Sequence, residues 1–106
     1  MDTRECVITE ELKTEWVEAL RSGKYVQGTG YLRDANEQFC CLGVLADIIN
    51  PTAWGKVEFN AYMFKNSFAT LSADILPRDI QEVLYTMNDH DKKTFIEIAD
   101  YIETNL

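Results

Sequence analysis

The segment Ser22–Ile49 constrains the fold most strongly, because its first half disfavours a helix and its second half favours one. The glycines within Lys24–Gly30 disfavour a helix, since glycine loses more backbone freedom than any other residue on becoming helical. Two short stretches that can form strands, Tyr31–Arg33 and Gln38–Cys40, flank the polar Asp34–Glu37, whose residue types are typical of turns. The pattern predicts a glycine turn followed by a β-hairpin.

A helix is predicted immediately after this hairpin. From Cys40 onward, apolar residues recur at helical spacing on most sides of the helix, which is typical of an element at the centre of a core. Gly43 costs this helix about 1 kcal/mol relative to alanine, so we expect it to permit a close backbone contact. The helix is predicted to end at Asn50, because the residue before a proline avoids the helical region.

The flanking segments predict three more helices. The first, Glu10–Ser22, has Thr9 as its N-cap and acidic residues in its first turn. Pro77 suits the first position of another helix, and Thr94 begins the final helix of the chain with a capping box. Residues 52–70 are rich in aromatic side chains without a dominant period, so a strand over Lys56–Met63, a loop anchored by aromatic residues and a short helix remain alternatives there.

These elements predict one compact domain over residues 1–106 with an α+β fold, in which three to four amphipathic helices pack with a small antiparallel hairpin or sheet. A chain of this length can bury one core without a metal or a disulfide. The predicted core residues are Trp16, Leu20, Phe39, Cys41, Val44, Leu45, Ile48, Ile80, Leu84, Phe95, Ile98 and Ile102.

The net charge of −8 is concentrated toward the two ends of the chain. Such a field repels duplex DNA, so direct binding to duplex nucleic acid is not expected. Two interpretations remain: a surface that only confers solubility, or an acidic face presented to a basic partner. The candidates for partner contact lie on the solvent face of the first helix and are Glu11, Glu15 and Glu18.

Neither a secretion signal nor a membrane span is predicted. The start of the chain has mixed charge and lacks the apolar core of a signal peptide. The longest apolar run, Cys40–Ala46, is far shorter than the ~20 residues that cross a bilayer. We therefore expect a cytoplasmic monomer or small homo-oligomer without membrane contact.

The glycine-rich loop is the candidate ligand site. Its backbone N–H groups and two neighbouring cations could surround an anion such as a nucleotide phosphate. The candidate residues are Lys24, Tyr25, Gln27, Gly28, Gly30 and Arg33. The loop matches neither the GxxxxGK[ST] phosphate loop nor the GxGxxG dinucleotide fingerprint. Glycines that lead into a hairpin need no ligand, so a structural role is the alternative.

No catalytic residue, metal site or cofactor is predicted. A helix dipole would favour a thiolate at Cys40 or Cys41, but the only histidine, His90, is distant in the sequence. Burial in the core is the simpler interpretation of these cysteines. Asn88–Asp91 offers potential metal ligands too close together to converge on one ion, and its residue types are those of a turn.

Two segments resemble a family of small proteins that are common in bacteriophage genomes. The chain's SGKYVQGTGYLRD and FCCLGVLADI are similar to the front motif ALRSGxYxQGxGxLR…CCLGVLxDL, and MNDHDKKTFIEIADYIE is similar to the ending LNDxxxKSFxEIADxIE. Met87 and Ala46 depart from the leucine and cysteine that are common in that family. The motif positions are Gly23, Tyr25, Gln27, Gly28, Gly30, Leu32, Arg33, Cys40, Cys41, Leu42, Gly43, Asn88, Asp89, Phe95, Ile98 and Ala99.

The resemblance implies a phage or prophage protein acting in an infected bacterial cell, and it brings no established activity or site. The leading hypothesis is a non-catalytic accessory protein that binds and modulates a host protein, for instance a defence or replication factor. The alternative is a binder or sponge for a nucleotide-like ligand, which would use the segment Lys24–Arg33. A cysteine-dependent enzyme is the third hypothesis.

Overall fold

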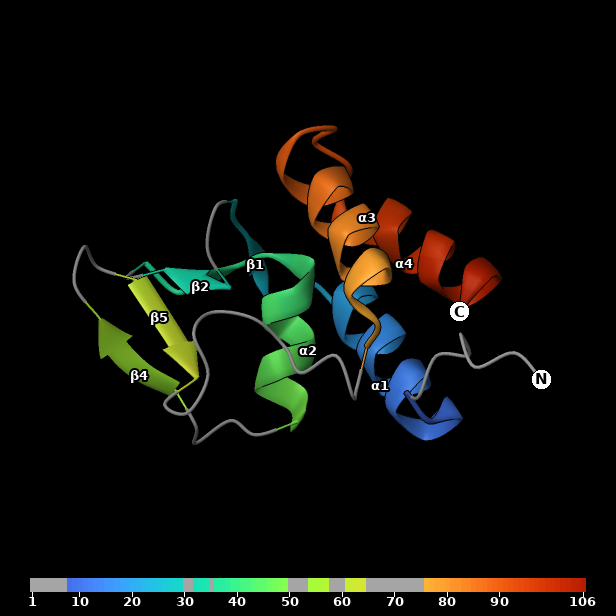
Figure 1. The fold of residues 1–106 in the computed structure, drawn as a ribbon, viewed down its shortest axis with the longest axis horizontal. Coiled ribbons are helices and arrows are strands. Elements are labelled where there is room, and N and C mark those ends of the chain that lie inside the picture. Colours follow the sequence, from blue (N-terminus) through green and yellow to red (C-terminus); the bar gives the residue numbers. More distant parts are fainter. Residues whose placement is uncertain (1–7, 30–31, 35, 50–53, 58–60, 65–75) are drawn as a thin grey trace.

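A computed structural model describes residues 8–29, 32–34, 36–49, 54–57, 61–64 and 76–106 (Figure 1). These residues form four helices and five short strands, and the predicted α+β class is confirmed. The helices are α1 (Glu10–Arg21), α2 (Cys41–Ile49), α3 (Arg78–Asp89) and α4 (Phe95–Asn105). The strands are β1 (Val26–Gln27), β2 (Arg33–Asp34), β3 (Gln38–Phe39), β4 (Trp54–Val57) and β5 (Ala61–Phe64).

The sheet has the order β1-β3-β2-β5-β4. The predicted hairpin is present as the antiparallel pair β2–β3. Where a single strand over Lys56–Met63 was one alternative, the structure has two strands, β4 and β5, that pair with each other in antiparallel orientation. The rest of 52–70 lies outside the described residues. Beyond the antiparallel pairing that the sequence predicts, β1 runs parallel to β3, so the sheet is mixed. The backbone N–H of Gly28 donates to the carbonyl of Phe39 at 2.8 Å, which holds β1 against β3 rather than β2.

The helix caps follow the sequence closely. The Thr9 hydroxyl accepts the backbone N–H of Leu12 at 3.0 Å and begins α1. Thr94 and Glu97 form the complete capping box of α4. Pro77 is the N-cap of α3 rather than its first helical residue, since its ψ of 146° is extended and the helix begins one residue later.

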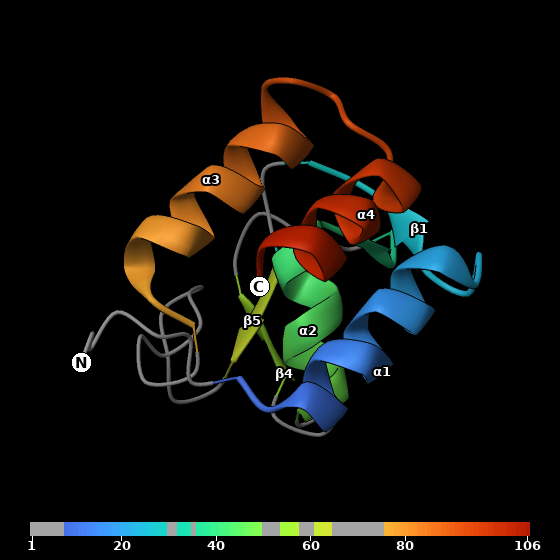
Figure 2. The ribbon, with the colours of Figure 1, turned by 90° about the vertical axis from the view of Figure 1, so that its right-hand side faces the viewer.

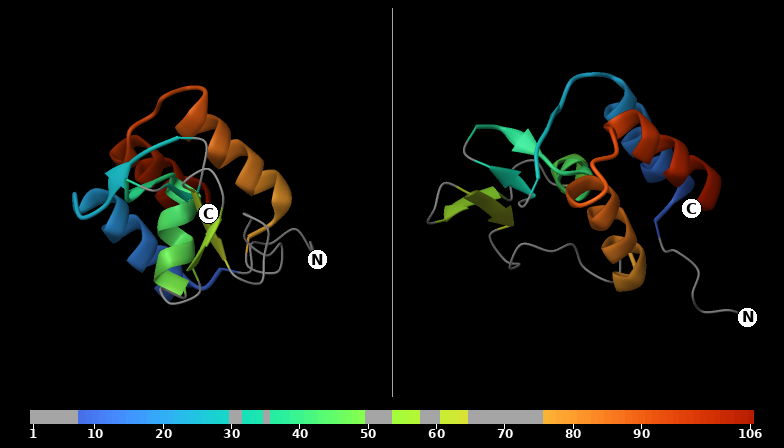
Figure 3. Two further views of the ribbon diagram at one scale, coloured as in Figure 1. Left: turned by 90° about the vertical axis from the view of Figure 1, so that its left-hand side faces the viewer. Right: turned by 90° about the horizontal axis from the view of Figure 1, so that it is seen from above.

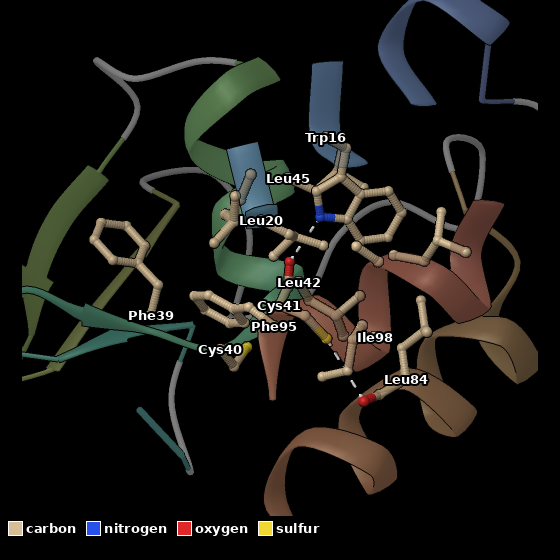
Figure 4. Packing of buried hydrophobic residues seen from close by; sticks show 14 of the residues in the cluster. Trp16, Leu20, Phe39, Cys40, Cys41, Leu42, Leu45, Leu84, Phe95 and Ile98 are labelled. Atoms are coloured by element: carbon tan, nitrogen blue, oxygen red, sulfur yellow. Dashed lines mark hydrogen bonds between the residues drawn. The ribbon is translucent and has the colours of Figure 1, made fainter. Parts of the chain in front are cut away.

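The core surrounds α2, whose residues 41–46 are all buried. Two buried hydrogen bonds connect this helix to its neighbours (Figure 4). The Trp16 indole N–H of α1 donates to the Cys41 carbonyl at 3.0 Å. The Cys41 thiol donates to the Leu84 carbonyl of α3 at 3.6 Å. Because these bonds join different helices, they fix the positions of α1 and α3 relative to α2.

Most of the predicted core is buried, while Ile48 and Ile80 are only half-buried and pack against it. Among the largest fully buried side chains of the described residues, Leu76 and Asn88 are the two that were not predicted. The expected close contact at Gly43 is confirmed, because a Cβ built there would lie 1.7 Å from the carbonyl oxygen of Leu32.

Helices α1, α3 and α4 lie at one end of the molecule and the β4–β5 hairpin at the other, with α2 between them, as Figure 1 and the view from above in Figure 3 show. Helices α1 and α4 lie side by side along one flank and make the most extensive contact between any two elements (Figure 2). The solvent-facing sides of α1 and α4 therefore form one continuous flank of the protein.

Within the described ranges, no helix has the length and apolar character needed to cross a bilayer.

Candidate functional site

A buried asparagine joins the two segments of the chain that resemble the phage-protein motifs. The Asn88 side chain is 1% exposed, and its amide oxygen accepts from Gln27 Nε2 at 2.9 Å and from the backbone N–H of Cys41 at 3.3 Å. Its amide nitrogen donates to the Gly28 carbonyl at 2.8 Å and to Asp89 Oδ1 at 2.8 Å. We call Asn88 with Gln27, Gly28 and Cys41 the Asn88 junction.

The Asn88 junction explains the structural role of several motif positions. It supplies the N-terminus of α2 with a hydrogen-bond acceptor from α3, and it gives the partly buried carbonyl of Gly28 a hydrogen-bond donor. The Gln27 amide nitrogen also donates to the Lys93 carbonyl at 2.8 Å, which holds the end of the α3–α4 connection, directly before the N-cap of α4. Gln27 is thus engaged within the protein rather than directed at a ligand.

The sequence contained one signal for this junction. Asn88 follows Leu84 by four residues, which places it on the apolar face of α3 rather than in the turn that was predicted for Asn88–Asp91. The helix continues through Asp89, and only the following residues form the turn. A polar side chain on a buried helical face needs partners within the protein, and this requirement could have identified Asn88.

The other predicted ligand-binding residues are directed to several different partners. Gly28 packs closely against β3, because a Cβ there would lie 2.7 Å from Cβ of Gln38. Lys24 is exposed, and its backbone N–H donates to the Ser22 hydroxyl at 3.0 Å. Gly30 lies outside the described residues.

Tyr25 and Arg33 both pack on the ring of Phe39. The Tyr25 ring meets it edge-on with 4.9 Å between centroids, and the Arg33 guanidinium lies over it at 5.4 Å. The Tyr25 hydroxyl donates to Asp47 Oδ2 at 2.7 Å, and Arg33 forms an ion pair with Glu37. Burial, followed by this hydrogen bond to Asp47, raises the pKa of Tyr25. Gln27 and Gly28 thus bond to Asn88, whereas Tyr25 and Arg33 pack on Phe39. The described contacts therefore do not direct the predicted anion-binding residues toward one common point.

Both described cysteines are core residues. Cys40 is 5% exposed and Cys41 is fully buried. Burial raises the pKa of Cys40 to about 11 and the pKa of Cys41 well above its ordinary value, so both thiols are protonated at neutral pH. Neither has the lowered pKa that a nucleophilic cysteine needs. In the part of the chain that the structure describes, no three histidine, cysteine or acidic side chains are grouped to bind a metal.

The predicted acidic side chains form a row on the outer face of α1. Glu11, Glu15 and Glu18 are all exposed, and together with Glu10 and Thr14 they line a shallow, open concavity. We call Glu11, Glu15 and Glu18 the acidic row. None of the three forms an ion pair with another described residue.

Helix α4 adds acidic groups beside α1, but a cation of α1 neutralises part of this charge. Arg21 donates to Asp100 Oδ1 at 2.6 Å and to Glu103 Oε1 at 2.9 Å. These hydrogen bonds raise the pKa of Arg21 and lower the pKa of Glu103. The flank formed by α1 and α4 therefore has a neutralised part around Arg21 and an unneutralised part along the acidic row.

Comparison with other proteins leads to one family. No curated protein and no solved structure matches this chain. Residues 8–83 match the family model described as Domain of unknown function (DUF8296). The matched region includes Gln27, Gly28 and Cys41 of the Asn88 junction and the entire acidic row, and it ends within α3 before Asn88. Because the match covers well over half of its residues, this chain belongs to the DUF8296 family.

Proposed function

We propose that this protein is a non-catalytic accessory protein that binds a basic surface of a host protein through the acidic row. The observation that carries the proposal is the exposed line of carboxylates at Glu11, Glu15 and Glu18 without described ion-pair partners. The resemblance to phage proteins supports a bacterial host as the source of the partner. The partner would be modulated through occupation of its basic surface.

The spacing of the acidic row suits a linear basic surface. Positions four and three residues apart lie on one face of a helix, and they rise about 6 Å and then about 4.5 Å along its axis. Three negative charges therefore lie along roughly 10 Å of α1. A partner that presents lysine or arginine side chains at similar intervals could pair with all three.

The acidic row is not explained by the stability of α1. Like charges four residues apart, as at Glu11 and Glu15, destabilise a helix by roughly 0.2–0.5 kcal/mol. Glu18 lies near the C-terminal end of α1, where the helix dipole disfavours an anion. Only Glu11, in the first turn, benefits from the dipole. A basic partner would relieve the repulsion between these carboxylates. The acidic row is therefore better explained by binding to such a partner than by stabilisation of the fold.

Such an interface has a recognisable salt dependence. Interactions between exposed charges are screened over about 8 Å at physiological ionic strength. Charge complementarity at an exposed surface mainly raises the association rate, and added salt reduces this gain. We therefore expect binding to weaken steadily as the salt concentration rises.

A pair of charge-matched variants tests the proposal. Glu15→Gln with Glu18→Gln removes two charges from the acidic row, and Glu82→Gln with Asp91→Asn removes two exposed charges from α3 and the loop after it. Tagged wild-type and variant proteins would capture partners from a bacterial lysate at several salt concentrations, followed by mass spectrometry. We expect a protein that the wild type and the control retain and that the row variant loses by at least tenfold.

Two outcomes would refute the proposal. One is that no protein is retained above background at low salt. The other is that the row variant and the control retain the same proteins equally, which would show that the position of the charges does not matter. Circular dichroism of all three proteins checks that α1 remains folded, so that lost binding cannot be attributed to unfolding.

The geometry favours the nucleotide-binding alternative less. Capture of an anion by the predicted loop would have to compete with the Arg33–Glu37 ion pair and with the two hydrogen bonds of the Gln27 amide. A thermal shift assay with a nucleotide library separates the two hypotheses, since a ligand at 100 times its Kd stabilises a protein by about 2.7 kcal/mol. We expect no shift, and a shift that Lys24→Ala abolishes would favour this alternative.

A further inference from the structure

We draw no further inference here: the strongest candidate, the pair of exposed apolar side chains formed by Val26 on the edge strand β1 and Ile96 at the start of α4, carries nothing because nothing in the structure shows what covers it.

Discussion

Replacement of Asn88 by alanine should destabilise the protein far more than the loss of one polar side chain usually does. The substitution removes the acceptor of the Cys41 N–H, which is buried, and the donor to the Gly28 carbonyl, which is partly buried. A buried polar group that loses its partner costs about 1–3 kcal/mol. Gln27 keeps its bond to the Lys93 carbonyl and adds less. The expected loss is about 2–5 kcal/mol of the roughly 5–15 kcal/mol that stabilises a domain.

Urea unfolding followed by tryptophan fluorescence measures this loss. A slope of about 1–3 kcal/mol per molar urea converts the expected loss into a midpoint lower by about 1 M or more. Asn105→Ala is the matched control, because Asn105 is exposed and its amide donates to the Tyr101 carbonyl of its own helix. We expect the control to change stability by less than about 0.5 kcal/mol. A loss at Asn88→Ala of the same size as the control would refute the role of the Asn88 junction.

Two further predictions concern the residues around α2. Gly43→Ala should lower the free energy of unfolding, measured by urea titration, by about 3 kcal/mol, because the new Cβ would lie 1.7 Å from the Leu32 carbonyl oxygen. This loss outweighs the gain of about 1 kcal/mol in helix propensity. Gly23→Ala, which has open space and a φ of +79°, should cost only about 1 kcal/mol, and equal losses would contradict the reasoning. The Cys6→Ser variant leaves Cys40 and Cys41 as its cysteines. In this variant, iodoacetamide should label the folded protein at neutral pH far more slowly than the urea-unfolded protein. The reason is that a pKa of about 11 at Cys40 leaves about one thiol in ten thousand ionised. Rapid labelling of the folded protein would show that the thiols are accessible and activated.

The Asn88 junction changes how the two segments that resemble phage proteins are interpreted. Gln27 and Gly28 come from the front motif and Asn88 from the ending, and their side-chain and backbone groups bond directly to one another. The motifs therefore describe a structural connection between β1, α2 and α3 at these positions. The acidic row lies outside these motif positions.

The sequence by itself determined the features that depend on neighbouring residues. Thr9 and Thr94 cap their helices through backbone groups three residues further along, so each cap could be predicted from a short segment. The apolar spacing within α1 and α4 likewise identified their buried faces, including those of Trp16 and Ile98. The exposure of the acidic row followed from the same helical periodicity.

Only the tertiary structure decided which distant groups meet. Sequence reasoning placed Gln27 in an anion site, whereas its amide bonds to Asn88, 61 residues later in the chain. The parallel pairing of β1 with β3 and the burial of Leu76 also depend on packing between segments far apart in sequence. The physical reason is that a polar side chain takes the nearest buried partner, and the fold rather than the local sequence determines which partner is near.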